Sequence, residues 1–187
     1  MPSEKSQNAE GILAEDHEAL GKLLHDLLAA LGQAYAPAAF KRLDLFWARL
    51  AMHIRGEHLH LFPAILSAFD GDTSELADET PTVSEAREVI AQLHSDHDFF
   101  MHELAAAIKI MRDCRTNAGG NSTAAIDSVR QLIATVRDRL EVHNKLEEDM
   151  VYRWPAKLME PAAQTALAAE IREELRNLPP RFREEAD

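Results

Sequence analysis

The amino-acid sequence predicts an all-α protein, an antiparallel up-down four-helix bundle with an internal pseudo-twofold repeat, followed by a C-terminal helix. Apolar residues recur every three or four positions over four long segments, a spacing that gives each helix one buried stripe. Glycine is scarce, with seven in 187 residues, while Ala, Leu, Glu and Arg are abundant and favour helix. The links are short to moderate, so neighbouring helices should run antiparallel.

The first half of the chain contains two predicted helices. The first spans about residues 9–31, and its stripe contains Leu13, Leu20, Leu24, Leu27 and Leu31. The second spans about residues 38–69, and its stripe contains Leu43, Trp47, Leu50, Ile54, Leu61 and Ala64. Pro63 should kink or end this helix locally, because proline lacks an amide donor and clashes with the preceding turn.

The second half repeats this arrangement after the polar stretch DGDTSELADETPT. A third helix is predicted over about residues 83–111 and a fourth over about 124–154, separated by the breaker RTNAGGNST. The predicted domains are a flexible N-terminus (1–9), the bundle (10–156), and a C-terminal helix with a charged tail (157–187). We expect the proline-broken tail to fray. The C-terminal helix could dock on the bundle, on a second copy or on a protein partner.

Composition excludes several classes of partner. The formal net charge of -12 argues against nucleic acid, which is bound by clustered Lys and Arg, and against an anionic membrane surface. No apolar stretch approaches the length of a membrane span, and the N-terminus lacks the apolar region of a secretory signal. Cys114 is the only cysteine, so no intrachain disulfide forms. The sequence therefore predicts a cytoplasmic protein.

Polar residues interrupt all four apolar stripes. They are His17, His53, Glu57, His97, His143 and Glu147. A lone histidine on an apolar face is most often an ordinary core residue. Buried carboxylates are costly unless they are paired or coordinated, and no Lys or Arg shares these stripes. Six such residues on four stripes, at matching heights, therefore predict a metal site.

The halves also repeat around these residues. EDHEAL (15–20) matches SDHDFF (95–100), and HIRGE (53–57) matches HNKLE (143–147). Residues four apart share a helical face, so each His-x-x-x-Glu pair can point at one place. Two such hairpins packed about a pseudo-twofold axis suit two metal ions bridged by the two glutamates.

The order of these motifs resembles the hemerythrin-like, or HHE cation-binding, family over about residues 10–156. The resemblance implies two non-haem iron ions with oxo or hydroxo and carboxylate bridges. It also implies a function in dioxygen carriage, in the response to oxygen or nitric oxide, or in iron handling. By ligand type alone, manganese or zinc would also fit imidazole and carboxylate ligands.

The sequence departs from the oxygen-carrying members of that family. They place a further histidine where Leu93 stands, and an aspartate where Glu148 stands. His94, on the flank of the third helix, is a candidate seventh ligand. Without it, one coordination position on each iron remains open. This favours sensing, peroxide chemistry or iron holding over reversible carriage.

We therefore expect a small-ligand protein that binds dioxygen, nitric oxide or peroxide for sensing or stress response. No catalytic residue is assigned, and any enzymatic activity would be peroxide- or nitric oxide-related at the metal centre. The alternative is an iron-binding regulatory module in which metal occupancy controls folding or partner binding. A ferritin-like centre is excluded because the fourth helix has no Glu-x-x-His motif. His-Glu-x-x-His, the zinc-hydrolase motif, is also absent.

Other polar residues near the stripes have weaker predictions. His58 and His102 should face solvent, because each is five residues from a ligand histidine and lies about 140° from it. His60 should be an outer contact of the centre or line an access path. Asp16 and Asp96 are either solvated carboxylates or hydrogen-bond acceptors for imidazole N–H groups.

Overall fold

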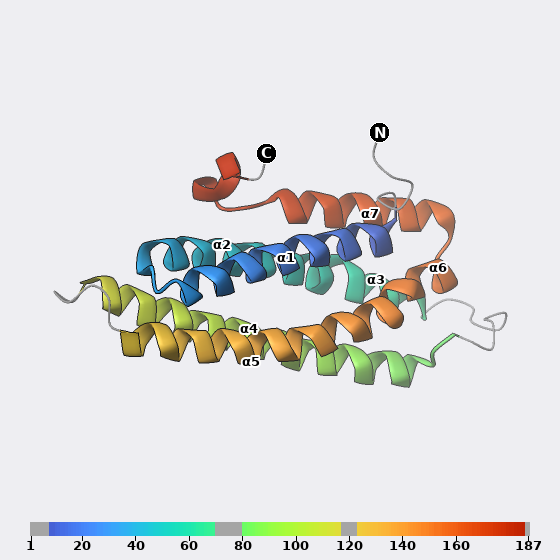
Figure 1. Ribbon diagram of the computed structural model, residues 1–187. Coiled ribbons are helices and arrows are strands. Elements are labelled where there is room, and N and C mark those ends of the chain that lie inside the picture. The colour runs from blue at the N-terminus through green and yellow to red at the C-terminus, as the bar shows by residue number, and fades with distance from the viewer. Residues whose placement is uncertain (1–7, 70–79, 117–122, 186–187) are drawn as a thin grey trace.

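The computed structural model describes residues 8–69, 80–116 and 123–185. Within these ranges every regular element is helical, which confirms the all-α prediction. The bundle consists of α1 (Ala9–Gly32), α2 (Ala36–Gly56), α4 (Val83–Thr116) and α5 (Thr123–Asp149). The α1–α2 hairpin packs on the α4–α5 hairpin, as Figure 1 shows, with α1 against α5 and α2 against α4. Of the predicted flexible N-terminus, residues 1–7 lie outside the described ranges.

Local signals fix where the helices begin. Asn8 caps α1, since its Oδ1 accepts a hydrogen bond from the backbone N–H of Gly11 over 2.8 Å. Thr82 and Glu85 form a reciprocal capping box at the start of α4. These caps satisfy backbone N–H groups in the first turns of both helices.

The second predicted helix is continuous but contains a π-helical turn. α2 leads into the turn η2 (Glu57–Leu61) and then into α3 (Phe62–Ala68). The backbone N–H of Phe62 donates to the carbonyl oxygen of Glu57, five residues back. Pro63 then stands in the first turn of α3, where its missing N–H costs little. The irregularity predicted from Pro63 is thus absorbed one turn earlier, at the residues of the candidate site.

The fourth predicted helix ends earlier than its apolar periodicity suggests. α5 stops at Asp149, and Met150 adopts φ -128° and ψ -69°, outside the helical region. The short turn η3 (Val151–Arg153) and helix α6 (Trp154–Leu158) follow. The break turns Tyr152 into the interior, where its side chain is buried.

The C-terminal helix docks on the chain's own bundle. α7 (Pro161–Arg176) lies along α1 and α2 (Figure 1) and buries Leu167, Ala168 and Ile171. The expectation that the tail frays is wrong for its first part, because Leu178 and Phe182 pack against Ala48 of α2. A final turn, η4 (Pro180–Glu185), completes the described chain.

Two apolar clusters fill the bundle, one on each side of a polar band. One contains Leu20, Leu24, Leu50, Phe100 and Leu140, and the other contains Leu13, Leu61, Phe62, Leu93 and Trp154. The buried polar residues lie on the same helices between them. Among the described helices, none combines the length and apolar character needed to cross a bilayer.

Candidate metal centre

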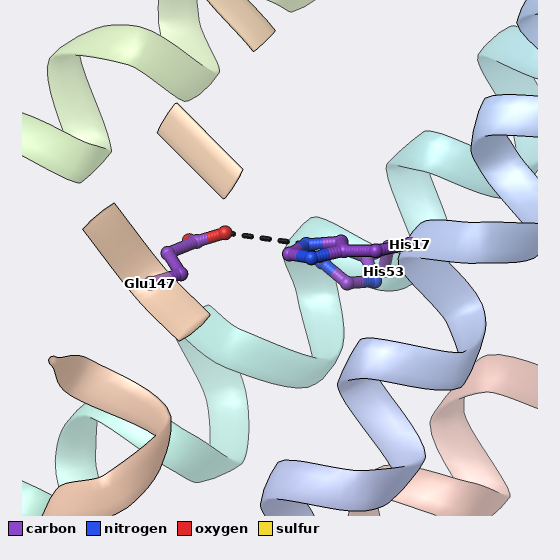
Figure 2. A group of neighbouring side chains, drawn as sticks. All are labelled: His17, His53 and Glu147. Atoms are coloured by element: carbon purple, nitrogen blue, oxygen red, sulfur yellow. Dashed lines mark hydrogen bonds and ion pairs between the residues drawn. The ribbon is translucent and has the colours of Figure 1, made fainter. Parts of the chain in front are cut away.

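All six residues predicted as ligands meet in the polar band. Each is buried, with at most 6% of its surface exposed. α1 contributes His17, α2 and its π-helical turn contribute His53 and Glu57, α4 contributes His97, and α5 contributes His143 and Glu147. Figure 2 shows Glu147 pointing from α5 toward the rings of His17 and His53. The sequence prediction that these side chains face one place therefore agrees with their positions.

The first group lies on the side of α1 and α2. The Nε2 atoms of His17 and His53 are 3.1 Å apart, and Glu147 Oε2 lies 3.3 Å from Nε2 of His17. Glu57 Oε1 lies 3.5 Å from Nε2 of His53. Two imidazoles and Glu147 thus face one another here, with Glu57 against His53.

The second group lies on the side of α4 and α5 and mirrors the first. The Nε2 atoms of His97 and His143 are 3.0 Å apart. Glu57 Oε2 lies 3.3 Å from Nε2 of His97, and Glu147 Oε1 lies 3.1 Å from Nε2 of His143. Each glutamate therefore directs one oxygen to each group, which is the arrangement of a bridging carboxylate.

Asp16 and Asp96 hold two of the histidines from outside. Asp16 Oδ2 accepts from Nδ1 of His53 over 3.0 Å, and Arg49 donates to its other oxygen over 2.6 Å. The equivalent contacts of Asp96 are with Nδ1 of His143 over 3.2 Å and with the Arg139 guanidinium. Burial alone would raise the pKa of Asp16, but His53 and Arg49 lower it below its usual value. The solvated alternative considered for both aspartates is wrong, and each holds the imidazole of a neighbouring helix.

The other two histidines have unlike outer partners. Nδ1 of His17 donates to Glu148 Oε1 over 2.7 Å, and this hydrogen bond lowers the pKa of Glu148. Nδ1 of His97 lies 2.8 Å from Nε2 of His58, whose ring stacks on that of His94 with centroids 4.1 Å apart. His94 itself is exposed, so it covers His58 rather than joining the inner group.

The prediction that His58 faces solvent is wrong. A rotation of 100° per residue holds for a regular α-helix, whereas a π-helical turn advances fewer degrees per residue. His58 lies in such a turn, is half-buried and contacts His97. Burial, followed by the neighbouring His94, lowers the pKa of His58 below its usual value. His102 is exposed, as predicted, and His60 pairs with Glu170 of α7 over 3.4 Å.

Tyr152 is part of the centre and was not predicted from the sequence. Its hydroxyl donates to Glu57 Oε1 over 2.6 Å, and its oxygen lies 3.1 and 3.3 Å from Nε2 of His17 and His53. Burial and the two glutamates raise the pKa of Tyr152 well above its usual value, so it keeps its proton. Sequence periodicity could not identify Tyr152, because the predicted helix continued to Trp154 without the break at Met150 that turns this side chain inward.

The hydrogen bonding of the centre calls for cations. A carboxylate only accepts, so Nδ1 of His17, His53 and His143 carries the hydrogen, and Nε2 of the neutral ring offers a lone pair inward. Nitrogen lone pairs about 3 Å apart repel unless a proton or metal ion lies between them. Glu57 Oε2 and Glu147 Oε1 also lack a hydrogen-bond donor of good geometry. The donor set thus fits metal ions, which would accept the lone pairs of the inward Nε2 atoms and of the glutamate oxygens.

The pKa shifts of the buried histidines also reflect the carboxylates around them. Burial lowers the pKa of His53, but Glu57 and Asp16 outweigh it and raise the value well above the usual range. The pKa of His143 is raised likewise, by Glu147 and Glu57 against burial. His97 differs: burial and the neighbouring histidines lower its pKa to about 3 despite Glu57. The carboxylates that face His53 and His143 thus favour a positive charge at these two rings.

A family model for the hemerythrin HHE cation-binding domain matches residues 8–155. The chain belongs to this hemerythrin family. All six buried His and Glu residues lie within the match, while α7 lies beyond it. No curated protein and no solved structure gives a significant match to this hemerythrin-like chain. Two of its His/Glu groups have ligand atoms close enough to share a metal ion, His17, His53 and Glu147 in one and His97, His143 and Glu147 in the other.

Proposed function

We propose that this hemerythrin-like protein holds two iron ions and binds dioxygen, nitric oxide or peroxide for sensing or stress response. The observation that carries the proposal is that four imidazole nitrogens and two carboxylates face one another inside the bundle. The hydroxyl of Tyr152 is the one hydroxyl donor among these described side chains. Imidazole and carboxylate ligands suit iron, and manganese or zinc remain the alternatives to test. The single cysteine fits our proposal of a cytoplasmic location.

In this proposal the ligands divide between two positions. His17 and His53 would hold one ion, His97 and His143 the other, and Glu57 and Glu147 would bridge the two. Bound iron would supply one-electron redox chemistry and exchangeable positions for a small ligand. The outer contacts of the four imidazoles fix the ring orientations before any ion binds.

The chain's own side chains shape what reaches the centre. Leu93 is fully buried in the apolar cluster beside the centre and supplies no donor atom there. Phe62 lies in the same cluster, with its ring centroid 6.2 Å from that of His97. These side chains exclude water from one side, while the Tyr152 hydroxyl donates to Glu57 Oε1 over 2.6 Å. A small apolar or weakly polar ligand fits such surroundings better than a charged metabolite.

The test is an anaerobic purification followed by metal analysis and visible spectroscopy. We expect two iron ions per chain and absorption bands that change when oxygen or nitric oxide is added. Replacing Leu93 with His should supply a further imidazole and alter the rate of that change. Iron that binds without any ligand-sensitive band would contradict the small-ligand proposal.

The iron-dependent regulatory module remains the alternative from another class. It would place a partner protein or a second copy on the C-terminal helix. That helix buries its apolar residues on its own bundle and is tied to α2 by Arg55, which donates to Glu174 over 2.6 Å. This docking gives the alternative less support. A regulatory module would show metal-dependent melting without ligand-sensitive absorption bands.

A further inference from the structure

The internal repeat relates the two halves of the metal centre residue by residue. The aspartates, the ligand histidines of α2 and α5, and the supporting arginines all correspond: Asp16 with Asp96, His53 with His143, and Arg49 with Arg139. The charges of these outer residues are therefore equal on the two sides. Any difference between the metal positions must come from residues that break the repeat.

Glu148 and His58 break it at one pair of equivalent positions. Each directly follows the ligand glutamate of its helix, and each contacts Nδ1 of a ligand histidine, at 2.7 Å for Glu148 and 2.8 Å for His58. The partner of His17 is thus an anionic carboxylate, whereas the partner of His97 is an imidazole. A second pair also differs, because Tyr152 stands where the first half has Phe62. The Tyr152 hydroxyl is neutral and donates to Glu57, so it adds no charge to either side.

The difference between Glu148 and His58 favours a cation at the position formed by His17 and His53. A carboxylate that accepts the Nδ1 hydrogen makes the opposite ring nitrogen a stronger donor to metal, and it adds one negative charge nearby. The Glu148 side chain is 45% exposed, so water screens part of this charge, but its hydrogen bond to His17 remains charge-assisted. Both sides share the two buried glutamates, but Nδ1 of His97 faces the His58 ring, where Nδ1 of His17 has a carboxylate.

We propose that the two metal positions are inequivalent, and that the identities of Glu148 and His58 decide their order of filling. The position formed by His17 and His53 binds its ion more tightly and fills first. The position formed by His97 and His143 fills second and exchanges its ion, next to the surface pair His58 and His94. This inference rests on the proposed two-metal centre. Outer contacts of this kind change metal affinity by about 10–100-fold, which is the difference expected here.

The experiment uses the full chain loaded with Zn²⁺, which is diamagnetic and redox-inert. A soluble chelator then lowers the content to one ion per chain, and nitrogen-15 spectra of the histidine rings report which Nε2 atoms still bind metal. We expect His17 and His53 to keep the metal signature while His97 and His143 lose it. In the exchanged variant His58→Glu/Glu148→His, the order should reverse.

A matched control makes the same exchange of His and Glu at positions away from the centre. His102→Glu/Glu141→His exchanges the same residue types at two exposed positions of the same bundle, and the order should stay as in the wild type. Equal loss of signal from all four histidines in the wild type would overturn the inference, as would loss from His17 and His53 first. A chain that binds no zinc at these histidines would instead contradict the proposed metal centre itself.

Discussion

The hydroxyl of Tyr152 donates a hydrogen bond to Oε1 of the buried Glu57. Replacing Tyr152 with Phe leaves Glu57 Oε1 without this donor inside an apolar surround. The free energy of unfolding of the metal-free protein should fall by about 1–3 kcal/mol, the typical penalty for a buried polar group left unsatisfied. Urea unfolding in the presence of a chelator measures this change.

The control for that variant is Tyr35→Phe. Tyr35 is 56% exposed at the start of α2 and makes no side-chain cap, so its loss of a hydroxyl should change the stability little. Equal unfolding midpoints for Tyr152→Phe and the wild type would mean that water, rather than Tyr152, satisfies the carboxylate.

His53 links metal binding to pH. Its pKa is raised well above the usual value because Glu57 and Asp16 outweigh its burial, so we expect the ring to bind a second proton, at Nε2, when metal is removed. Metal must displace that proton, and about one proton or more should be released on loading at pH 7. The apparent metal affinity should therefore rise as pH increases toward the raised pKa of His53. A pH indicator in weakly buffered solution measures the release, and loading without any proton release would contradict the assignment.

At the scale of elements, two local irregularities build the centre. The π-helical turn at Glu57–Leu61 brings His58 against His97, and the break at Met150 brings Tyr152 against Glu57. Helical spacing predicts the six inward residues because they lie on regular stretches or at their ends. It misplaces His58 and misses Tyr152, because both lie where the number of residues per turn changes. Pro63 signals one irregularity, but the position at which a helix absorbs it depends on packing.

The C-terminal helix belongs to the same packed unit as the bundle. Ile171 is fully buried, and its Cγ2 would lie 3.8 Å from a Cβ placed on Gly56, one residue before the candidate ligand Glu57. Replacing Ile171 with Ala should lower the free energy of unfolding by about 2–5 kcal/mol, the usual range for a cavity of this kind. Chemical denaturation measures the loss. Glu173→Ala, on the exposed face of the same helix, should have little effect, and equal behaviour of the two variants would show that α7 docks only loosely.

At the scale of the whole molecule, the periodicity of four segments was enough to predict the bundle and its polar band. The docking of α7 was not predictable, because its weak apolar face could equally have met a second copy. Leu178 and Phe182 similarly look like part of a charged tail until their contacts with α2 are seen. Sequence patterns report which face of a helix is apolar, and the partner of that face is decided by the rest of the chain.

We expect the buried carboxylates to couple the stability of the whole bundle to metal. Without metal, Glu57 and Glu147 lie fully buried between two apolar clusters, held by protons on neighbouring imidazoles and by Tyr152. The metal-free protein should therefore melt well below the loaded form. Each bound ion should add about 2.7 kcal/mol to the free energy of unfolding when free metal is 100 times the dissociation constant of that site. Replacing both glutamates with Gln should recover much of the loss without metal. Calorimetry measures both effects, and equal melting temperatures for the metal-free and loaded wild type would contradict the coupling.

Six residues from four helices, as we propose, hold two metal ions in each chain. The most direct measurement is the metal content of the purified protein, compared with that of His17→Ala/His53→Ala and His97→Ala/His143→Ala. We expect about two ions in the wild type and a clear loss in each double variant, with the helical fold retained in circular dichroism. A wild type that binds no metal, or double variants that still bind two ions per chain, would contradict the proposed centre.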